Sequence, residues 1–488
     1  MKTLDQIRST GIALNTTNTP GDASYEFVIT QAGSYYLTSN LNVTKPNGIH
    51  VTVAGVTVDL NGFQISRSSG ASGGGITIDS TAHHCTVGNG SITAFADGIR
   101  VAALGGFARG CAFRDLSMSG CTSSGIIAGD GAVLDSCRVH DNSGGFGVGS
   151  INAGAGSTLR NCTANNNTAG TYAILASGAC SLINCTAVNN AVQHAISAGA
   201  GSTLTNCLAN FNTSDQAISD GFITGQGCTL TNCVAYQNVS TAGASTGTTG
   251  AGFILANGCQ IRGCTAQFNG GDGFHLSAGA TTGERSTITD CTAANNGGDG
   301  IKTGVGSTIT LCTSSRNAAH GIDASTNAVI KDCTLFENDG DGIKAVDNSV
   351  IQSCAARANQ GNGITVATAC LIADCVANLS GKKTAPNNTA SDGIELGARN
   401  RVVNCTVFSN AQHGINGVSS SNRNFIEGCL AHSNDSFGIA LQANGNTVIK
   451  NQVGGNTGGT INQSGGGVAP LNNASDPVGT IHPLANFQ

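Results

Sequence analysis

Three stretches of the sequence place acids, glycines and a lysine or histidine in a similar order. They read N-G-G-D-G-I-K-T at 296–303, N-A-A-H-G-I-D-A at 317–324 and N-D-G-D-G-I-K-A at 338–345. Carboxylates beside lysine or histidine can hold a sugar, transfer protons or bind a divalent cation. Because the pattern recurs, its positions must first be divided into those that build a turn and those that can do chemistry.

A repeating unit of roughly 21–26 residues positions these stretches. Thirteen of the 20 cysteines mark the unit, and four successive intervals from Cys291 to Cys375 are 21 residues long. Leu, Ile or Val stands three residues before each of these cysteines, and Asn stands five residues after all of them except Cys375. The series is Cys137, Cys162, Cys185, Cys207, Cys233, Cys264, Cys291, Cys312, Cys333, Cys354, Cys375, Cys405 and Cys429.

Short runs broken by Gly, Asn and Asp are typical of brief strands joined by turns. We therefore predict an all-β, single-domain, right-handed parallel β-helix of about sixteen coils, roughly 75–80 Å long at the inter-strand spacing. The cysteine and isoleucine positions become buried columns, and the asparagines become a ladder at a turn where Asn tolerates left-handed backbone. The β-helix is assigned to residues 51–453, an N-terminal cap to 1–50 and a C-terminal cap or tail to 454–488.

Four further cysteines stand five residues before members of the series and predict a second buried column. They are Cys180, Cys228, Cys259 and Cys370. A free cysteine packs as a small hydrophobic residue, and the absence of any C-x-x-C pair argues against zinc. Stacked thiols lie close enough for an occasional disulfide, although parallel side-chain directions suit one poorly, so the thiol or disulfide state stays open.

Composition narrows the classes of partner. A formal charge of −6 on 488 residues does not indicate nucleic acid, and no apolar stretch is long enough for a membrane span. The first residues, M-K-T-L-D-Q-I-R-S-T-G, have no apolar core typical of a secretory signal. We expect either a cytoplasmic protein or a chain that starts after its signal.

The ladder pattern resembles that of the pectate-lyase-like superfamily of right-handed parallel β-helix proteins, and it extends over about 51–453. More narrowly, G-S-Y-Y-L-T-S-N-L at 33–41 and V-T-V-D-L-N-G-F at 56–63 resemble bacterial right-handed parallel β-helix repeat proteins. The resemblance implies a secreted or cell-surface protein. It does not choose a function, because this fold carries lyases, hydrolases, esterases, tailspikes and adhesins. The catalytic motifs of galacturonan hydrolases and calcium-dependent pectate lyases have no counterpart, so no role is carried over.

Two outward columns of polar residues are predicted in the later coils. The first follows each late-coil Ile or Phe and comprises His275, Lys302, Asp323, Lys344, Thr365, Glu395 and Asn416. The second stands two residues before the same Ile or Phe and comprises Asp272, Asp299, His320, Asp341, Asn362, Asp392 and His413. Earlier coils place Leu175, Ser197, Ser219 and Ile254 at roughly matching positions, so the charge is expected to be local to the later coils.

Two insertions flank this stripe, at 238–252 and 380–392. Both fall between the Asn turn and the next strand, which is the same corner of the coil. About five coils separate them, or roughly 24 Å at the inter-strand spacing. We expect them to form the walls of a groove whose floor is the first column, since loops on rigid scaffolds commonly carry function.

The leading functional prediction is binding, and cleavage by β-elimination, of an acidic polysaccharide in this groove. A cation would neutralise the polymer carboxylate while a lysine or histidine of lowered pKa removes a proton. The residues predicted to be catalytic are Lys302, Lys344, Asp323, His275 and His320. Those predicted to bind the polymer are Asp299, Asp341, Glu395, Lys382 and Lys383.

Three alternatives stay open. A hydrolase would use a pair among Asp299, Asp323 and Asp341 as acid and base. A Ca²⁺ ion, which no feature of the sequence requires, would bind through oxygens of Asp272, Asp299 and Asp341. A structural or adhesive rod needs no chemistry at all, because alternating lysine and aspartate simply avoids like-charge contacts on an exposed strand column.

Overall fold

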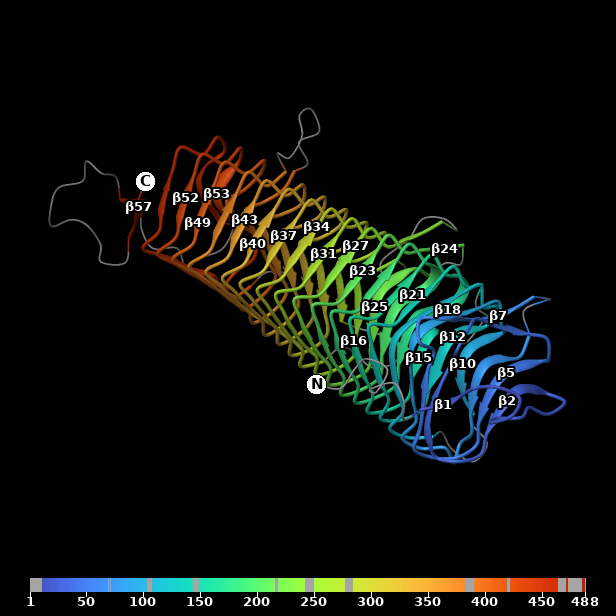
Figure 1. The fold of residues 1–488 in the computed structure, drawn as a ribbon. Helices are drawn as coiled ribbons and strands as arrows, with labels where there is room; N and C mark the ends of the chain where they lie inside the picture. Colours follow the sequence, from blue (N-terminus) through green and yellow to red (C-terminus); the bar gives the residue numbers. More distant parts are fainter. Residues whose placement is uncertain are drawn as a thin grey trace, which may run out of the picture. The chain divides into compact units, whose positions relative to one another are not determined.

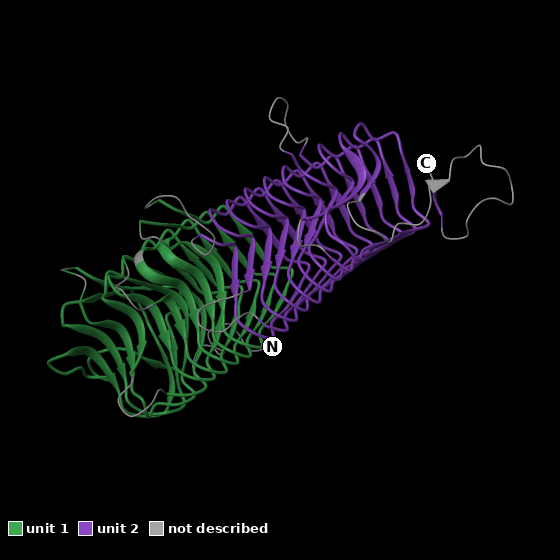
Figure 2. Ribbon diagram, turned by 180° about the vertical axis from the view of Figure 1, so that it is seen from behind, with its two compact units in different colours: residues 1–244 green, residues 245–488 purple. Residues whose placement is uncertain are grey.

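The computed structural model describes residues 11–68, 70, 72–102, 108–143, 149–215, 218–241, 250–276, 284–381, 390–418, 422–463, 471–472 and 485–487. The described residues form strands and turns and contain no helix. Within these ranges there is accordingly no apolar helix of the length that crosses a membrane. The chain divides into two compact units, 1–244 and 245–488, coloured green and purple in Figure 2.

Unit 1 is built of parallel strands that recur once per coil (Figure 1). One stack contains β2 (Tyr25–Ile29), β5 (Asn47–Val51), β8 (Gly74–Ile78), β10 (Asp97–Val101), β12 (Ser124–Ala128), β15 (Gly149–Ala153), β18 (Thr168–Ala176), β21 (Ala191–Ala198), β24 (Thr213–Ser214), β25 (Asp220–Thr224) and β28 (Val239–Ser240). The other strands are β1 (Ile12–Ala13), β3 (Gly33–Tyr36), β4 (Leu41–Val43), β6 (Val56–Asp59), β7 (Gln64–Arg67), β9 (Thr86–Thr93), β11 (Ala112–Ser119), β13 (Val133–Asp135), β14 (Arg138–His140), β16 (Thr158–Arg160), β17 (Thr163–Asn165), β19 (Ser181–Ile183), β20 (Thr186–Val188), β22 (Thr203–Thr205), β23 (Leu208–Asn210), β26 (Thr229–Thr231) and β27 (Val234–Tyr236).

Unit 2 repeats the arrangement with shorter and more uniform coils. Its first stack contains β29 (Phe253–Leu255), β32 (Phe274–Leu276), β35 (Ile301–Thr303), β38 (Ile322–Ala324), β41 (Ile343–Ala345), β44 (Ile364–Val366), β47 (Ile394–Leu396), β50 (Ile415–Gly417), β53 (Phe437–Leu441) and β56 (Gly459–Gln463). The second contains β30 (Gln260–Arg262), β33 (Thr287–Thr289), β36 (Thr308–Thr310), β39 (Val329–Lys331), β42 (Val350–Gln352), β45 (Leu371–Ala373), β48 (Arg401–Val403), β51 (Phe425–Glu427) and β54 (Thr447–Ile449). The third contains β31 (Thr265–Gln267), β34 (Thr292–Ala294), β37 (Thr313–Ser315), β40 (Thr334–Phe336), β43 (Ala355–Arg357), β46 (Val376–Asn378), β49 (Thr406–Phe408), β52 (Leu430–His432), β55 (Gln452–Gly454), β57 (Leu471–Asn472) and β58 (Asn486–Phe487).

The predicted fold class is confirmed, with about 18 coils instead of the sixteen predicted. The difference arises partly near the N-terminus, where residues 25–50 were predicted to belong to a cap. These residues instead supply coil strands, because β2 pairs in parallel with β5, β3 with β6 and β4 with β7. Their alternating apolar residues therefore extend the core and do not cover its end.

The predicted asparagine ladder is confirmed in both units. In unit 2, Nδ2 of Asn317 donates to Oδ1 of Asn338 at 3.0 Å and to the carbonyl oxygen of Ala293. Oδ1 of Asn317 accepts hydrogen bonds from Nδ2 of Asn296, at 3.0 Å, and from the backbone N–H of Asn296. Each ladder asparagine is buried, so these bonds satisfy polar groups that water cannot reach.

The left-handed backbone position is not the one predicted. The ladder asparagines have no positive φ; the residue before each one does, as at Asn166 (φ 54), Phe211 (φ 56) and Arg316 (φ 54). Because Phe and Arg also occupy this position, the turn itself imposes the left-handed conformation. Asparagine is required at the next position for its hydrogen bonds and not for its backbone tolerance.

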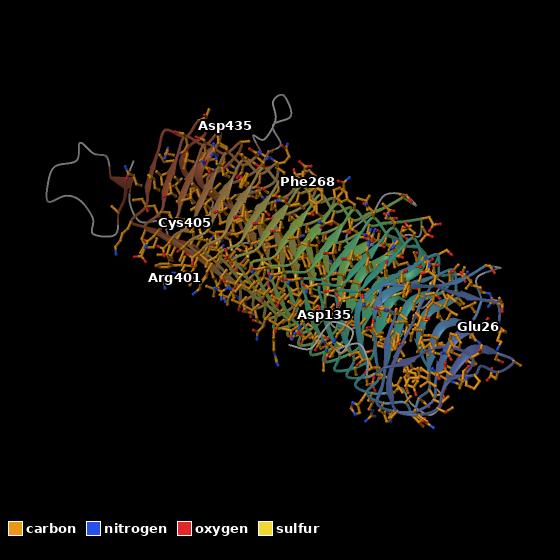
Figure 3. The ribbon with its side chains drawn as sticks, in the orientation of Figure 1. Glu26, Asp135, Phe268, Arg401, Cys405 and Asp435 are labelled. Atoms are coloured by element: carbon orange, nitrogen blue, oxygen red, sulfur yellow. The ribbon has the colours of Figure 1, made fainter. Side chains whose placement is uncertain are left out.

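The core consists of buried Ile, Leu, Val, Ala, Phe and Cys side chains. All twenty cysteines are buried free thiols. Figure 3 labels two residues of unit 2 that illustrate the division: Cys405 is 1% exposed, whereas the side chain of Arg401 is 60% exposed. A cysteine sulfur atom of one coil can contact the backbone of the neighbouring coil. For example, the N–H of Cys264 donates to Sγ of Cys291 at 3.4 Å.

Candidate functional site

The first polar column is in register throughout unit 2. Parallel pairing aligns its members one per coil: Ile254, His275, Lys302, Asp323, Lys344, Thr365, Glu395 and Asn416. In unit 1 the matching residue after Ser197 is Ile223 and not Ser219, whose buried hydroxyl donates to the carbonyl of Asn212. In unit 1 this column contains Arg100. The prediction that charged side chains of the column occur only in the later coils is therefore too narrow.

The second column forms a ladder of side-chain acceptors that the sequence did not predict. Each member accepts the backbone N–H of the equivalent residue one coil later, at 2.7–3.2 Å. The acceptors are Asp272, Asp299, His320, Asp341, Asn362, Asp392 and His413, and the last accepts the N–H of Phe437. The signal in the sequence was that Asp, Asn or His occupies this position in seven successive coils, from Asp272 to His413.

This ladder gives most of the second column a structural role. The N–H groups that it satisfies lie at the turn entering each strand of the first stack, and a buried N–H without an acceptor is costly. Oδ1 of Asp299 accepts the N–H of His320 at 2.9 Å, and Oδ2 lies 3.2 Å from Nζ of Lys302. The predicted polymer-binding residues Asp299 and Asp341 are therefore at least half engaged within the fold.

His275 does not lie on an open groove floor. Its Nδ1 is 2.6 Å from Oδ2 of Asp272, and the two side chains are only 4% and 1% exposed. The other carboxylate oxygen of Asp272 accepts the N–H of Asp299 at 2.7 Å. In this arrangement the side chain of His275 is separated from solvent, and its predicted catalytic role stays a prediction.

Lys302 lies between two carboxylates. Its Nζ is 3.2 Å from Oδ2 of Asp299 and 3.4 Å from Oδ2 of Asp323, and its side chain is 38% exposed. Burial, the largest single effect, lowers the pKa of Lys302, but the two carboxylates together raise it above its usual value. Lys302 is thus held as a cation, which favours the charge-neutralising part of the predicted mechanism over that of a base, and its catalytic role stays a prediction.

The pKa of Asp299 is raised by its surroundings. Burial raises its pKa, and the nearby Asp272 raises it further, against the opposing effects of the N–H of His320 and the ammonium of Lys302. The carboxyl group is therefore less acidic than an exposed aspartate.

His320 and Lys344 are two further basic residues of the stripe that reach solvent. Nδ1 of His320 accepts the N–H of Asp341 at 3.0 Å, so the neutral ring carries its proton on Nε2 and presents a donor. The side chain of His320 is 25% exposed. Lys344 is exposed, and among the described residues no carboxylate lies within 4.0 Å of its Nζ.

Glu395 is the carboxyl group best suited to proton transfer. Burial raises its pKa, followed by the charges of Asp392 and Asp341, while the amide of Asn362 donates to Oε2 at 3.1 Å. Burial also raises the pKa of Asp392, whose oxygens accept the N–H of His413 at 2.9 Å and the amide of Asn416 at 2.7 Å. Of these two acids, Glu395 is the less buried.

A shallow hollow of about 310 Å³ adjoins the first column. Lys302 and Asp323 form one side of it, and the turns after β35, β38 and β41 form the rest. Its lining is Lys302, Thr303, Gly304, Val305, Asp323, Ala324, Ser325 and Val346. A ligand in this hollow would meet a cation, a carboxylate and a hydroxyl side by side.

The remaining predictions concern loops and metal. Residues 242–249 and 382–389 lie outside the described residues, so the groove walls and the binding residues Lys382 and Lys383 stay predictions. Within the described ranges no three His, Cys, Asp or Glu side chains are grouped to hold a metal ion. A Ca²⁺ site at Asp272, Asp299 and Asp341 therefore has no geometric support there.

A family model describes the same fold as the structure. The family model described as "Right handed beta helix region" matches residues 97–255 and 222–377. No curated protein matches the sequence. Similar solved structures include the Dettilon tailspike protein, at 14% identity and a TM-score of 0.37 over 65% of this chain and 60% of that one. This chain thus spans less than two thirds of the tailspike chain.

Two epimerases are also similar in fold. A mutant of the periplasmic alginate epimerase AlgG is 13% identical, with a TM-score of 0.37 over 60% of this chain and 76% of that one. The A-module of mannuronan C-5 epimerase AlgE4 from Azotobacter vinelandii is 11% identical, with a TM-score of 0.18 over 90% and 91%. At these identities the likeness concerns the fold alone.

Proposed function

Because the chain belongs to the right-handed β-helix family, we propose that unit 2 binds an extended polysaccharide along its first polar column. One observation carries this proposal: five successive coils align Lys302, Asp323, Lys344, Thr365 and Glu395 in parallel register. The row advances by about 4.8 Å per coil, so it offers a linear polymer repeated polar contacts. The hollow beside Lys302 and Asp323 adds a concave surface to this row, where part of the polymer would fit.

The polymer is proposed to be acidic, with Lys344 as its main anion contact. The charge of Lys302 is already balanced by Asp299 and Asp323, whereas Lys344 has no carboxylate within ion-pair distance among the described residues. The predicted contacts from Lys382 and Lys383 would add to it. A secreted or cell-surface location fits such a ligand and is part of the same proposal.

Cleavage is proposed as a second property of this site. β-elimination would need Lys344 to neutralise the polymer carboxylate and a base beside it, and Nε2 of His320 becomes a base only when the ring's proton moves to Nδ1. Hydrolysis has a better-prepared acid, because the raised pKa of Glu395 keeps its carboxyl group protonated to higher pH than an exposed glutamate. Asp341 would be its partner carboxylate.

The test of binding uses affinity electrophoresis in gels containing alginate, pectate or a neutral glucan. Lys344→Ala should weaken retardation by the acidic polymers about tenfold, the effect of losing a charge-assisted contact of ~1.4 kcal/mol. Lys331→Ala removes a lysine from a neighbouring coil on the second stack and serves as the matched control. Equal retardation by the neutral glucan, or no loss in Lys344→Ala, would contradict the proposal.

The test of cleavage incubates the protein with the same polymers. Absorbance of an unsaturated product would identify β-elimination, and new reducing ends without that absorbance would identify hydrolysis. Glu395→Gln should abolish hydrolysis while retaining binding. If no polymer yields either product, the chain is a binding protein, and if none binds, the structural rod is the better description.

A further inference from the structure

Unit 1 contains a hollow that the polar columns of unit 2 do not explain. It measures about 590 Å³ and lies over β3 and β6. Ser34 and Tyr36 of β3 stand opposite Thr57 and Asp59 of β6 in parallel register, and all four line it. The volume falls within the range of about 300–1,000 Å³ typical of small-molecule sites.

The polar side chains of this hollow are held in position, and several of their hydrogen-bonding atoms remain available. Oδ1 of Asp59 accepts the N–H of Asn61 at 2.7 Å and the amide of Asn89 at 3.1 Å, which fixes the carboxylate. Oδ2 of Asp59 and the hydroxyls of Ser34, Tyr36 and Thr57 have no hydrogen-bond partner among the described residues. Three donors and a carboxylate acceptor are thus available to a ligand.

The aromatic ring of Tyr36 is held in place by neighbouring residues. It packs against Gly11, where a Cβ atom would lie 2.9 Å from Cδ1 of Tyr36. The strand pairing of β1 with β3 fixes the same segment, with Ala13 opposite Tyr36. Tyr36 is only partly buried, so part of the ring remains accessible to a ligand.

We propose that this hollow binds one ring of a neutral saccharide. A sugar presents hydroxyls that pair with a carboxylate and with side-chain hydroxyls, and its apolar C–H face packs on an aromatic ring. No lysine, arginine or histidine lines the hollow, and its one charged group is Asp59, so an acidic sugar would be repelled. The site lies in unit 1 and does not depend on the column proposed in unit 2.

The absence of tryptophan makes a direct test available. Tyr36→Trp introduces a single indole, whose emission should change saturably on titration with cellohexaose, maltohexaose or mannohexaose. Trigalacturonate should give no saturable change. Isothermal calorimetry on the unaltered chain with the same sugars checks that the substitution itself does not create or destroy the site.

Asp59→Asn is the diagnostic variant. It keeps an oxygen acceptor for Asn61 but replaces the carboxylate, so affinity for the neutral sugar should fall about tenfold while the melting temperature is unchanged. Lys344→Ala should leave this affinity unaltered, which separates failure here from failure of the unit 2 proposal. The inference is overturned if no neutral sugar binds by calorimetry, if trigalacturonate binds as well as the neutral sugars, or if Asp59→Asn binds as tightly as the unaltered chain.

Discussion

The ammonium nitrogen of Lys302 lies 3.2 Å from Oδ2 of Asp299, three residues earlier in the same coil. The same spacing recurs in unit 1, where Arg100 lies 3.6 Å from Oδ2 of Asp97 and the N–H of Ser124 donates to Oδ1 of Asp97. The acid thus caps a backbone N–H with one oxygen and holds a cation with the other. Because the motif recurs outside the candidate site, its first role is to stabilise the coil.

A pair of lysine variants separates stability from binding. Lys302→Ala removes the cation from the buried Asp299 and should lower the melting temperature by about 1–2 °C, the effect of roughly 1 kcal/mol in an ion pair that is partly exposed. Lys344→Ala should leave the melting temperature unchanged and weaken binding of acidic polymers. Thermal unfolding followed by circular dichroism, together with affinity electrophoresis, measures both. The reverse result, with Lys302 controlling binding and Lys344 stability, would contradict the assignment.

Glu395 should make stability depend on pH in a defined direction. Because its folded-state pKa is raised above 4.5, the folded protein favours the protonated form, and the stability this contributes is complete below pH 4.5. That contribution is lost as the pH rises through the folded-state pKa. Gln at position 395 cannot ionise. The melting temperature of Glu395→Gln should therefore rise relative to that of the unaltered chain as the pH increases from 4 to 8. A constant difference over this range would show that the pKa is not raised.

The asparagine ladder should be a major determinant of stability. Asn317→Ala leaves the backbone N–H of Asn296 without its acceptor and removes the side-chain bonds of residue 317 to Asn296 and Asn338. An unsatisfied buried N–H costs about 1–3 kcal/mol and each lost hydrogen bond adds about 0.5–1.5 kcal/mol, so the free energy of unfolding should fall by at least ~2 kcal/mol. Asn444→Ala, at an exposed turn of the same unit, is the control and should change it by less than about 0.5 kcal/mol. Equal effects would mean that the ladder is not stabilising.

The sequence predicted the ladder and the first column because both depend on spacing alone. A fixed interval places equivalent residues one above another, so Lys302, Asp323 and Lys344 could be aligned without coordinates. What spacing could not supply is the depth of each side chain. His275 and Lys302 share a column, yet one is buried against Asp272 and the other reaches solvent.

The roles of the second column were missed for a related reason. Asp341 and His320 look reactive in a sequence, but whether an oxygen or nitrogen is engaged depends on a backbone N–H one coil away. The hollow at Tyr36 was hidden because residues 1–50 were assigned to a cap, and a cap gives no register between Tyr36 and Asp59.

The buried cysteines should be unreactive until the protein unfolds. All twenty are buried, which keeps a reagent from their sulfur atoms, and for Cys121 burial also raises the pKa to about 11. In the native protein at pH 8, fewer than about one thiol per chain should react with a disulfide reagent within minutes, since reaction needs an accessible thiolate. In denaturant without reductant, the count should rise to 20. A lower count after unfolding would reveal disulfides between neighbouring coils, and rapid reaction of the native chain would show that the core opens to solvent.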